Sequence, residues 1–400
     1  MLFKGASAII PRLQILYTNI GRGHPFYLDG IIDALVRKGS IRLVRRQSDV
    51  FDVSNALPRL LWKTARWLYT HGSSGGLPGI LYRLVRSRAD YNGSGLMARM
   101  MGRDIRRMFL HTDGPLIVAH PTLVGMLRDR PDILYQHGEM VVPREALVGG
   151  ASIVFVPTDS AAEAFRQSGY SADQVVVSGL CIEPSLVKQA FESFDSRLDR
   201  YAGNGPLTGA FFSSGAEPGA HIEKLTAAAH SVLRKGDRAL IFARHGGRLV
   251  RQARRLFLKH GVAHLEVGSA DPIPVDPPPA LIVEFTNRRE ENIFGARLFP
   301  LFDYLVAPPH ERSNWACGLG LPMFTLEPSI GPFAPMNRDL LREQGVAEVL
   351  DTLDDARSLG TRVERLRNDG TLETMCRAGW GKQPISGFET IADYLLQHYD

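Results

Sequence analysis

Residues 15–24, Ile-Leu-Tyr-Thr-Asn-Ile-Gly-Arg-Gly-His, decide the fold of this chain. The apolar run 15–18 predicts a short buried strand, Gly21 and Gly23 predict a turn, and the apolar spacing over 27–38 predicts a helix. Such a turn leaves backbone N–H groups free at a helix start, where the helix dipole favours an anion. Strand, glycine turn and helix in succession are typical of a doubly wound parallel sheet.

Further apolar runs in the first half of the chain each end in a polar or proline-rich turn. These predicted strands are Ile41–Arg45, Leu116–His120, Ile133–Tyr135, Ile153–Val156 and Val175–Val177. The carboxyl ends of parallel strands lie along one edge of a sheet, and ligands bind there. His120, His137 and Glu139 stand at such ends, so we expect them near a ligand.

The same alternation restarts after residue 206. A charged helical stretch, 185–201, and the turn Gly-Asn-Gly-Pro at 203–206 predict a linker. A strand at 209–212 then runs into a second glycine turn, Ser213-Ser214-Gly215, followed by a helix and further βα units. We therefore predict an α/β protein with two Rossmann-like, doubly wound domains facing across a cleft. The predicted bounds are 1–185, a linker at 186–206, 207–385, and a C-terminal helix within 386–400.

The composition agrees with a two-domain globular protein. The chain has 400 residues, of which 44% are hydrophobic and 22% charged, and no run approaches the roughly 18–20 apolar residues of a membrane span. Residues 1–11 carry one lysine and a short apolar patch, so we expect no secretory signal. The three cysteines, Cys181, Cys317 and Cys376, show neither metal spacing nor a disulfide framework. A reducing cytoplasm is the expected location.

Basic residues gather in the first half of a chain whose net charge is +5. Over 57–69, Arg59, Lys63 and Arg66 recur at helical spacing beside Trp62 and Trp67, and Arg83, Arg86, Arg88, Arg103, Arg106 and Arg107 follow. A basic amphipathic helix with aromatic residues suits an anionic membrane surface, so we expect these five residues to contact the cytoplasmic face peripherally. The alternative is a core helix with a solvated basic face. No nucleic-acid module is present, so a nucleic-acid partner is not expected.

The order of these motifs resembles that of two-domain GT-B glycosyltransferases, in the family-28-like group of monogalactosyldiacylglycerol synthase, diacylglycerol glucosyltransferase and the lipid II-forming N-acetylglucosaminyltransferase. The segments that carry the resemblance are 20–24 (IGRGH), 62–69 with Leu81-Tyr82, 155–159 (FVPTD), 177–184 (VSGLCIEP), 212–215 (FSSG), 320–322 (GLP) and Asn337. The resemblance implies a nucleotide diphosphate-sugar donor, a lipid or membrane-presented acceptor, and a C-terminal helix that packs back on the first domain.

The chain also departs from the pattern of that group. Its members usually have two glycines and a threonine near Pro309, His310 and Arg312, and a ribose-binding glutamate falls on Trp315. Glu311 or Asn314 could replace that glutamate. The loop after Tyr135 usually offers an aspartate, where this chain has Gln-His-Gly-Glu at 136–139. These changes keep open a catalytically degenerate, nucleotide-binding protein of the same fold.

A metal-independent transfer requires protein groups that stabilise the leaving diphosphate. The predicted donor-binding residues are Ser213, Ser214, Gly215, Arg244, Phe285, Thr286, His310, Glu311, Arg312, Ser313, Asn314 and Asn337. Ser313 and Asn314 are expected to cap the helix at Trp315. By the resemblance, Phe285 and Thr286 contact the base through the backbone. Each turn could instead be capped without any ligand. No Asp-X-Asp motif ends a strand, so we expect neither a metal nor a cofactor.

The acceptor hydroxyl needs a general base in the first domain. His24 and Glu139 are the candidates, while Gly21, Arg22, Gly23, His120 and His137 form the acceptor side of the cleft. Alternatives are a soluble acceptor or epimerisation of the sugar nucleotide. A dinucleotide oxidoreductase is disfavoured because residues 21–24 lack a third glycine and no acidic residue ends the predicted second strand.

Overall fold

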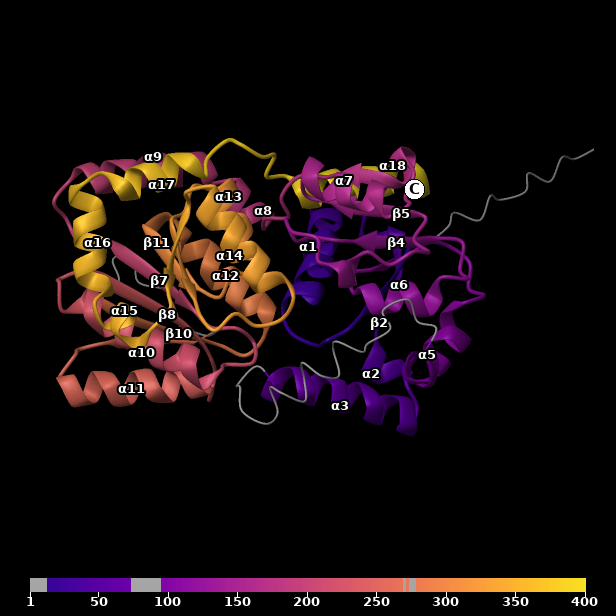
Figure 1. Cartoon of the computed structure of the whole chain (residues 1–400), viewed down its shortest axis with the longest axis horizontal. Helices are drawn as coiled ribbons and strands as arrows, with labels where there is room; N and C mark the ends of the chain where they lie inside the picture. The colour runs from indigo at the N-terminus through magenta and orange to yellow at the C-terminus, as the bar shows by residue number, and fades with distance from the viewer. Residues whose placement is uncertain (1–12, 73–94, 269–270, 273–277) are drawn as a thin grey trace, which may run out of the picture.

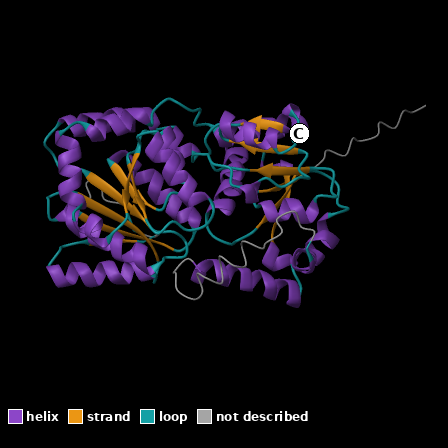
Figure 2. Ribbon diagram, in the orientation of Figure 1, coloured by secondary structure: helices purple, strands orange, loops and turns teal. Residues whose placement is uncertain are grey.

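The computed structural model describes residues 13–72, 95–268, 271–272 and 278–400. Two α/β domains lie side by side along the long axis of the molecule (Figure 1). Each has a central sheet flanked by helices (Figure 2). Leu81, Tyr82, Arg83, Arg86 and Arg88, named in the sequence predictions, lie outside the described residues.

The first domain, here the N-domain, is built on a six-stranded parallel sheet in the order β2-β1-β3-β4-β5-β6. Its strands are β1 (Leu13–Tyr17), β2 (Val44–Asp49), β3 (Leu116–Val118), β4 (Ile133–Gln136), β5 (Ile153–Val156) and β6 (Val175–Val177). Its helices are α1 (Gly23–Arg37), α2 (Val50–Val53), α3 (Ala56–Gly72), α5 (Leu96–Phe109), α6 (Pro121–Leu127) and α7 (Asp159–Gln167).

The second domain, the C-domain, has a seven-stranded parallel sheet in the order β13-β12-β11-β7-β8-β10-β9. Its strands are β7 (Thr208–Phe212), β8 (Arg238–Arg244), β9 (Leu265–Val267), β10 (Ala280–Phe285), β11 (Tyr304–Ala307), β12 (Met323–Leu326) and β13 (Ala347–Leu350). The helices from there to the end of the chain are α8 (Pro184–Val187), α9 (Ala190–Ala202), α10 (Gly219–Leu233), α11 (Arg248–His260), α12 (Arg288–Leu298), α13 (Ser313–Gly318), α14 (Phe333–Glu343), α15 (Leu353–Arg357), α16 (Leu359–Asn368), α17 (Thr371–Ala378) and α18 (Gly387–Tyr399).

The first strand shows why the apolar runs are continuous rather than alternating. Successive side chains of a strand point to opposite faces of the sheet. Ile15 enters the core beneath α1 and α18, whereas Leu16 enters the core on the other face, and both are fully buried. Helices cover both faces of a parallel sheet, so every position of the strand is buried and all but Gln14 are hydrophobic.

The last helix of the chain packs on the N-domain although it follows the C-domain. Phe388 and Ile391 of α18 are buried in one cluster with Ile31 of α1. A side chain at Gly30 would place its Cβ 2.2 Å from the Phe388 ring, so only glycine permits this approach. Leu180 N–H also donates to Pro384 O at 2.7 Å, and this bond joins the two segments that cross between the domains.

The second strand begins later than predicted, since 41–43 form a 3-10 turn and β2 runs to Asp49. An acidic residue therefore does end this strand, which corrects one of the two arguments against an oxidoreductase. Its carboxylate is already engaged, because it accepts from Phe51 N–H at 2.8 Å and from the Asn19 amide. In the described part of the chain, no helix is both long and apolar enough to cross a membrane.

Candidate functional site

A cavity of about 740 Å³ lies between the domains, and both glycine loops line it. The predicted residues that it brings together are Gly21, Arg22, Gly23, His24, Trp62, His120, Glu139, Ser213, Ser214, Gly215, His310, Glu311 and Arg312. The predicted residues outside its lining are Arg59, Lys63, Arg66, Trp67, His137, Arg244, Phe285, Thr286, Ser313, Asn314 and Asn337. The two loops read from the sequence thus meet at one site.

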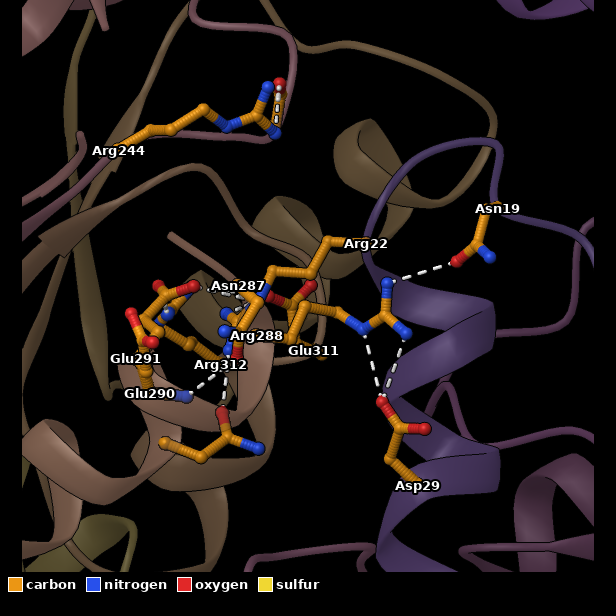
Figure 3. Close-up of polar contacts among 12 residues, drawn as sticks. Asn19, Arg22, Asp29, Arg244, Asn287, Arg288, Glu290, Glu291, Glu311 and Arg312 are labelled. Carbon is orange, nitrogen blue, oxygen red and sulfur yellow. Dashed lines mark hydrogen bonds and ion pairs between the residues drawn. The ribbon is translucent and has the colours of Figure 1, made fainter. Parts of the chain in front are cut away.

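A buried ion network joins the domains at this cavity (Figure 3). The Arg22 guanidinium, from the N-domain, donates to Glu311 at 2.8 Å and lies 3.2 Å from Glu291, both in the C-domain. Arg312 pairs with the same two carboxylates and stacks over the Phe212 ring at 3.9 Å. All four charged side chains are at most 10% exposed. Two cations and two anions therefore neutralise each other where the domains meet.

A second interdomain contact lies nearer to solvent. Arg288 pairs with Asp29 of α1 at 3.1 Å and donates to the Asn19 side chain at 3.0 Å. Tyr17 OH donates to the other oxygen of Asp29 at 3.0 Å. Arg22 and Arg288 together fix the N-domain glycine turn against the first turns of α12.

Trp315 fills the place where the resemblance puts a ribose-binding glutamate. It is 3% exposed, and its indole N–H donates to the Glu183 carboxylate at 2.9 Å. Glu311, a suggested replacement, is held by the two arginines. Asn314 is turned to the N-domain, where its amide donates to Cys181 O at 3.3 Å. The prediction that Ser313 and Asn314 cap the helix is wrong, because both lie inside α13 and its N-cap is Arg312.

Several buried polar atoms around the cavity have no partner within the described chain. They are Ser213 Oγ, Ser214 Oγ, Ser313 Oγ, His310 Nε2 and Arg312 Nε. Buried polar groups in native proteins are nearly always hydrogen-bonded, to protein, water or ligand. These atoms cluster about the second glycine loop and the start of α13, and nearly all can donate a hydrogen bond. The arrangement therefore suits an anionic ligand with many oxygen atoms.

Glu139 is the buried carboxylate that faces the first glycine loop. It is 7% exposed, and a side chain at Gly23 would place its Cβ 3.6 Å from Glu139 Oε1. Asn337, from the C-domain, donates to Glu139 at 2.9 Å and to Pro309 O at 3.1 Å. Burial raises the pKa of Glu139 to about 7, while the Asn337 hydrogen bond acts in the opposite direction. A carboxylate with such a pKa can accept a proton near neutral pH.

The three predicted histidines behave differently from one another. His24 and His120 lie against each other, with ring centroids 4.5 Å apart. His120 accepts from Thr122 N–H at 3.2 Å and so caps α6. His137 hydrogen-bonds Val141 O and packs on Phe165, and it does not itself line the cavity. Burial lowers the pKa of His24 to about 4, so its imidazole is neutral at pH 7 and a weaker base than Glu139.

The N-domain half of the cavity is largely apolar. Its lining residues there include Leu61, Ala65 and Leu68 of α3, Leu96, Met97 and Met101 of α5, and Met126 of α6. Leu96 and Met97 are also 75% and 59% exposed, so the apolar lining reaches the protein surface.

The membrane-contact prediction needs one correction on α3. Trp62 is 2% exposed and donates to Met101 O at 3.2 Å, so it packs between α3 and α5. Arg59, Lys63 and Trp67 lie on the exposed face of that helix. Arg66 is also exposed, with its guanidinium 4.6 Å from the Phe51 ring centroid. Trp62 was predicted to face the membrane because helical spacing shows which residues share a face. It does not show which face of the helix is buried against the rest of the protein.

The donor-side predictions Arg244, Phe285 and Thr286 lie outside the cavity lining. Arg244 is exposed and makes a 3.4 Å contact with Gly215 O. The backbone and hydroxyl of Thr286 both donate to Glu290, at 2.7 and 2.8 Å, and Asn287 caps α12. The turn that holds Phe285 and Thr286 is therefore closed on itself. To contact a ligand bound in the cavity, these residues would have to move, or the ligand would have to extend beyond the cavity lining.

Sequence reasoning missed Glu183, Glu291 and Asn292, which complete the network around Arg22 and Trp315. Asn292 accepts from Arg22 at 2.8 Å. Glu291 lies in the first turn of a helix, where a carboxylate is ordinarily read as a favourable dipole contact. The sequence gives little indication that Glu291 and Asn292 contact Arg22, because that arginine lies about 270 residues earlier in the chain.

No family model and no curated protein matches this chain. Solved structures match its fold. UDP-GlcNAc 2-epimerase from Neisseria meningitidis bound to UDP-GlcNAc gives a TM-score of 0.53 at 10% identity, covering 97% of this chain and 100% of that one. The S. aureus MnaA–UDP structure gives 0.51 at 11% identity, covering 97% and 95%.

The fold is GT-B. Acinetobacter baumannii MurG is also similar, with a TM-score of 0.48 at 14% identity over 97% of this chain and 100% of that one. The predicted architecture of two Rossmann-like domains facing across a cleft is confirmed. At these identities the likeness concerns architecture, and the narrower resemblance to the lipid-acceptor group stays a prediction.

A double-mutant cycle measures the interdomain network. We expect Arg22→Gln and Glu311→Gln to show a coupling free energy of about 1–3 kcal/mol in urea unfolding, because both side chains are buried and in contact. The exposed pair Lys235–Glu364, at 2.7 Å, is the matched control and should couple by less than about 1 kcal/mol. Equal coupling in the two pairs would contradict a structural role for Arg22.

Proposed function

We propose that this protein is a metal-independent glycosyltransferase that moves a sugar from a nucleotide diphosphate-sugar to a lipid or other membrane-presented hydroxyl. The observation that carries the proposal is the division of one cavity into two chemically different halves. Unpartnered donors and a buried arginine lie on the C-domain side, and an apolar lining open to the surface lies on the N-domain side. The family-28-like resemblance and a cytoplasmic, peripheral location belong to the same proposal.

The donor diphosphate is placed at the second glycine loop. Ser213 and Ser214 offer hydroxyl groups, and Arg312 offers a cation whose Nε is unpartnered. As the bond between the sugar and the diphosphate breaks, negative charge grows on the leaving oxygen, and donors fixed beforehand stabilise that charge. Glu311 and Glu291 hold Arg312 in position. The two carboxylates also offset the positive charge of the arginines. The serine hydroxyls therefore supply a larger share of the stabilisation of the diphosphate than the number of arginines alone would indicate.

The acceptor hydroxyl is placed on the N-domain side, beside the first glycine loop. Glu139 takes its proton while the hydroxyl oxygen attacks the anomeric carbon and the diphosphate departs. Asn337 orients the carboxylate through its 2.9 Å hydrogen bond across the domain interface. The base is therefore correctly held only when the domains are closed. His24, neutral and in contact with His120, closes the cavity wall beside it.

An apolar acceptor is supported by α3 and α5. Their side chains line the cavity, and their outer surface carries Leu60 and Leu96 at 58% and 75% exposure. Basic residues of α3 lie beside this apolar surface, which suits attraction to anionic lipids followed by insertion. A soluble acceptor would gain nothing from such a surface.

The second candidate is epimerisation of a sugar nucleotide, because Glu139 with a pKa of about 7 could remove a proton from carbon as well as from a hydroxyl. The two reactions have different requirements. An epimerase converts its sugar nucleotide without an acceptor, and it does not need the apolar half of the cavity. Incubation of the protein with UDP-GlcNAc alone, followed by NMR, separates the two candidates.

Calorimetry against nucleoside diphosphates and their sugars tests the donor site. At least one ligand should bind, and Ser213→Ala/Ser214→Ala should bind it about 30-fold more weakly, because each of the two lost hydrogen bonds contributes about 1 kcal/mol. Ser168→Ala, which removes an exposed hydroxyl that bonds Phe165 O, is the control and should bind as wild type. If no nucleotide binds, both candidate reactions fail. Binding without turnover on any acceptor, and without epimerisation of the sugar nucleotide, would support a degenerate protein.

The pH dependence of sugar transfer tests Glu139. The rate with a total lipid extract should rise with pH and level off above about 7, because the base must be ionised. Glu139→Gln should lower the rate by about 100-fold or more. Asn337→Ala should move the midpoint to higher pH because it removes a bond that stabilises the carboxylate, whereas the exposed Asn368→Ala should not. A wild-type rate for Glu139→Gln would exclude this base.

A further inference from the structure

We propose that the outer face of α11, in the C-domain, is a second membrane-binding surface that contacts the same anionic bilayer as α3. This inference rests on the proposed membrane-presented acceptor and adds a contact from the domain that binds the donor. The face is defined by Arg248, Arg251, Arg255, Leu258 and Lys259. Their spacing of three, four, three and one residues places them along one stripe of the helix.

The orientation of this stripe is fixed by the buried side of the helix. Leu249, Val250, Ala253 and Phe257 are fully buried in the C-domain core. All five members of the stripe are exposed, and Leu258 is 76% exposed. The stripe therefore points away from the domain along its whole length, for more than two helical turns.

The charges of this face are not neutralised by the protein. None of its four cations forms an ion pair with any residue that the structure describes. Arg251 and Arg248 contact only the backbone carbonyls of Gly246 and Glu217 through their guanidinium groups. By contrast Arg254, which leans toward the sheet, pairs with both Glu266 and Glu284. The nearest carboxylate to the stripe, that of Glu217, accepts from the backbone N–H of Arg248.

Helix α11 lies along the same edge of the molecule as α3. In Figure 1 both helices run along the lower edge, α11 under the C-domain and α3 under the N-domain. On α3, the exposed residues Arg59, Lys63 and Trp67 present a comparable mixture of cations and an aromatic ring, and no carboxylate lies on that helix. A bilayer laid along this edge would meet both domains at once, and α3 also lines the interdomain cavity.

The apolar residues within the stripes favour a lipid surface over a nucleic acid. Leu258 is 76% exposed among the α11 cations, and Leu60 and Trp67 are 58% and 48% exposed on α3. A phosphate backbone neutralises cations but leaves such side chains in water, whereas the interface of a bilayer accepts both. Two contacts on one bilayer would also raise avidity and fix the cavity over the membrane.

The experiment is co-sedimentation of the full chain with vesicles, either pure phosphatidylcholine or phosphatidylcholine with 30% phosphatidylglycerol. Arg251→Gln/Arg255→Gln should bind the anionic vesicles at least about tenfold more weakly than wild type, because each surface cation contributes to attraction. The matched control, Arg166→Gln/Lys382→Gln, removes two exposed cations from α7 and from the segment before α18, at the opposite edge, and should bind as wild type. Leu258→Ser should also weaken binding, and circular dichroism should show that each variant is folded.

Three outcomes count against the α11 contact, and they differ in whether the proposed function also fails. If the α11 variant binds like wild type while Arg59→Gln/Lys63→Gln loses binding, the α11 contact is excluded and the proposed function stands. If wild type does not bind anionic vesicles at all, both the α11 contact and a membrane-presented acceptor fail. If duplex DNA competes fully with vesicles at equal phosphate concentration, the face is a general polyanion surface and the proposal is overturned.

Discussion

The pairing of Arg22 with Glu311 and Glu291 is the interaction on which the site depends. A buried cation from one domain and two buried carboxylates from the other stabilise a closed arrangement only while all of them remain paired. Arg312 supplies the second positive charge, so the cluster is neutral as a set. The glycine turn of the N-domain is thereby held against the donor half of the cavity. The contact thus holds the glycine loops of the two domains at one cavity.

The same closure controls the candidate base. Glu139 lies in the N-domain, but its hydrogen-bond partner Asn337 comes from the C-domain, so closure sets both its orientation and its proton affinity. The raised pKa of Glu139 and its orientation by Asn337 thus both belong to the closed arrangement. In the proposed reaction, an acceptor would enter through the apolar half of the cavity, and a donor would bind at the unpartnered hydroxyls. The two substrates would then meet at the first glycine loop.

The sequence predicted what local patterns determine and missed what depends on distant partners. Both glycine loops, most strand positions and the two-domain architecture follow from strand–turn–helix repetition, which is a short-range signal. The roles of Trp62 and Asn314 were misread, because which side of a helix is covered depends on elements far along the chain. Glu183 lies in the motif at 177–184 and Glu291 in the first turn of a helix, but neither pattern indicates a contact with Trp315 or Arg22. Their partners become neighbours only after both domains fold and close.

Hydrogen exchange measured by mass spectrometry, with and without saturating uridine, guanosine or thymidine diphosphate, tests the central claim most directly. The claim is that one ligand binds between the loops of both domains. It predicts that the nucleotide slows exchange at 213–216 and 310–313 in the C-domain and, at the same ligand concentration, at 20–24 in the N-domain. Slowed exchange in the C-domain alone, or in neither loop for every nucleotide, would contradict it.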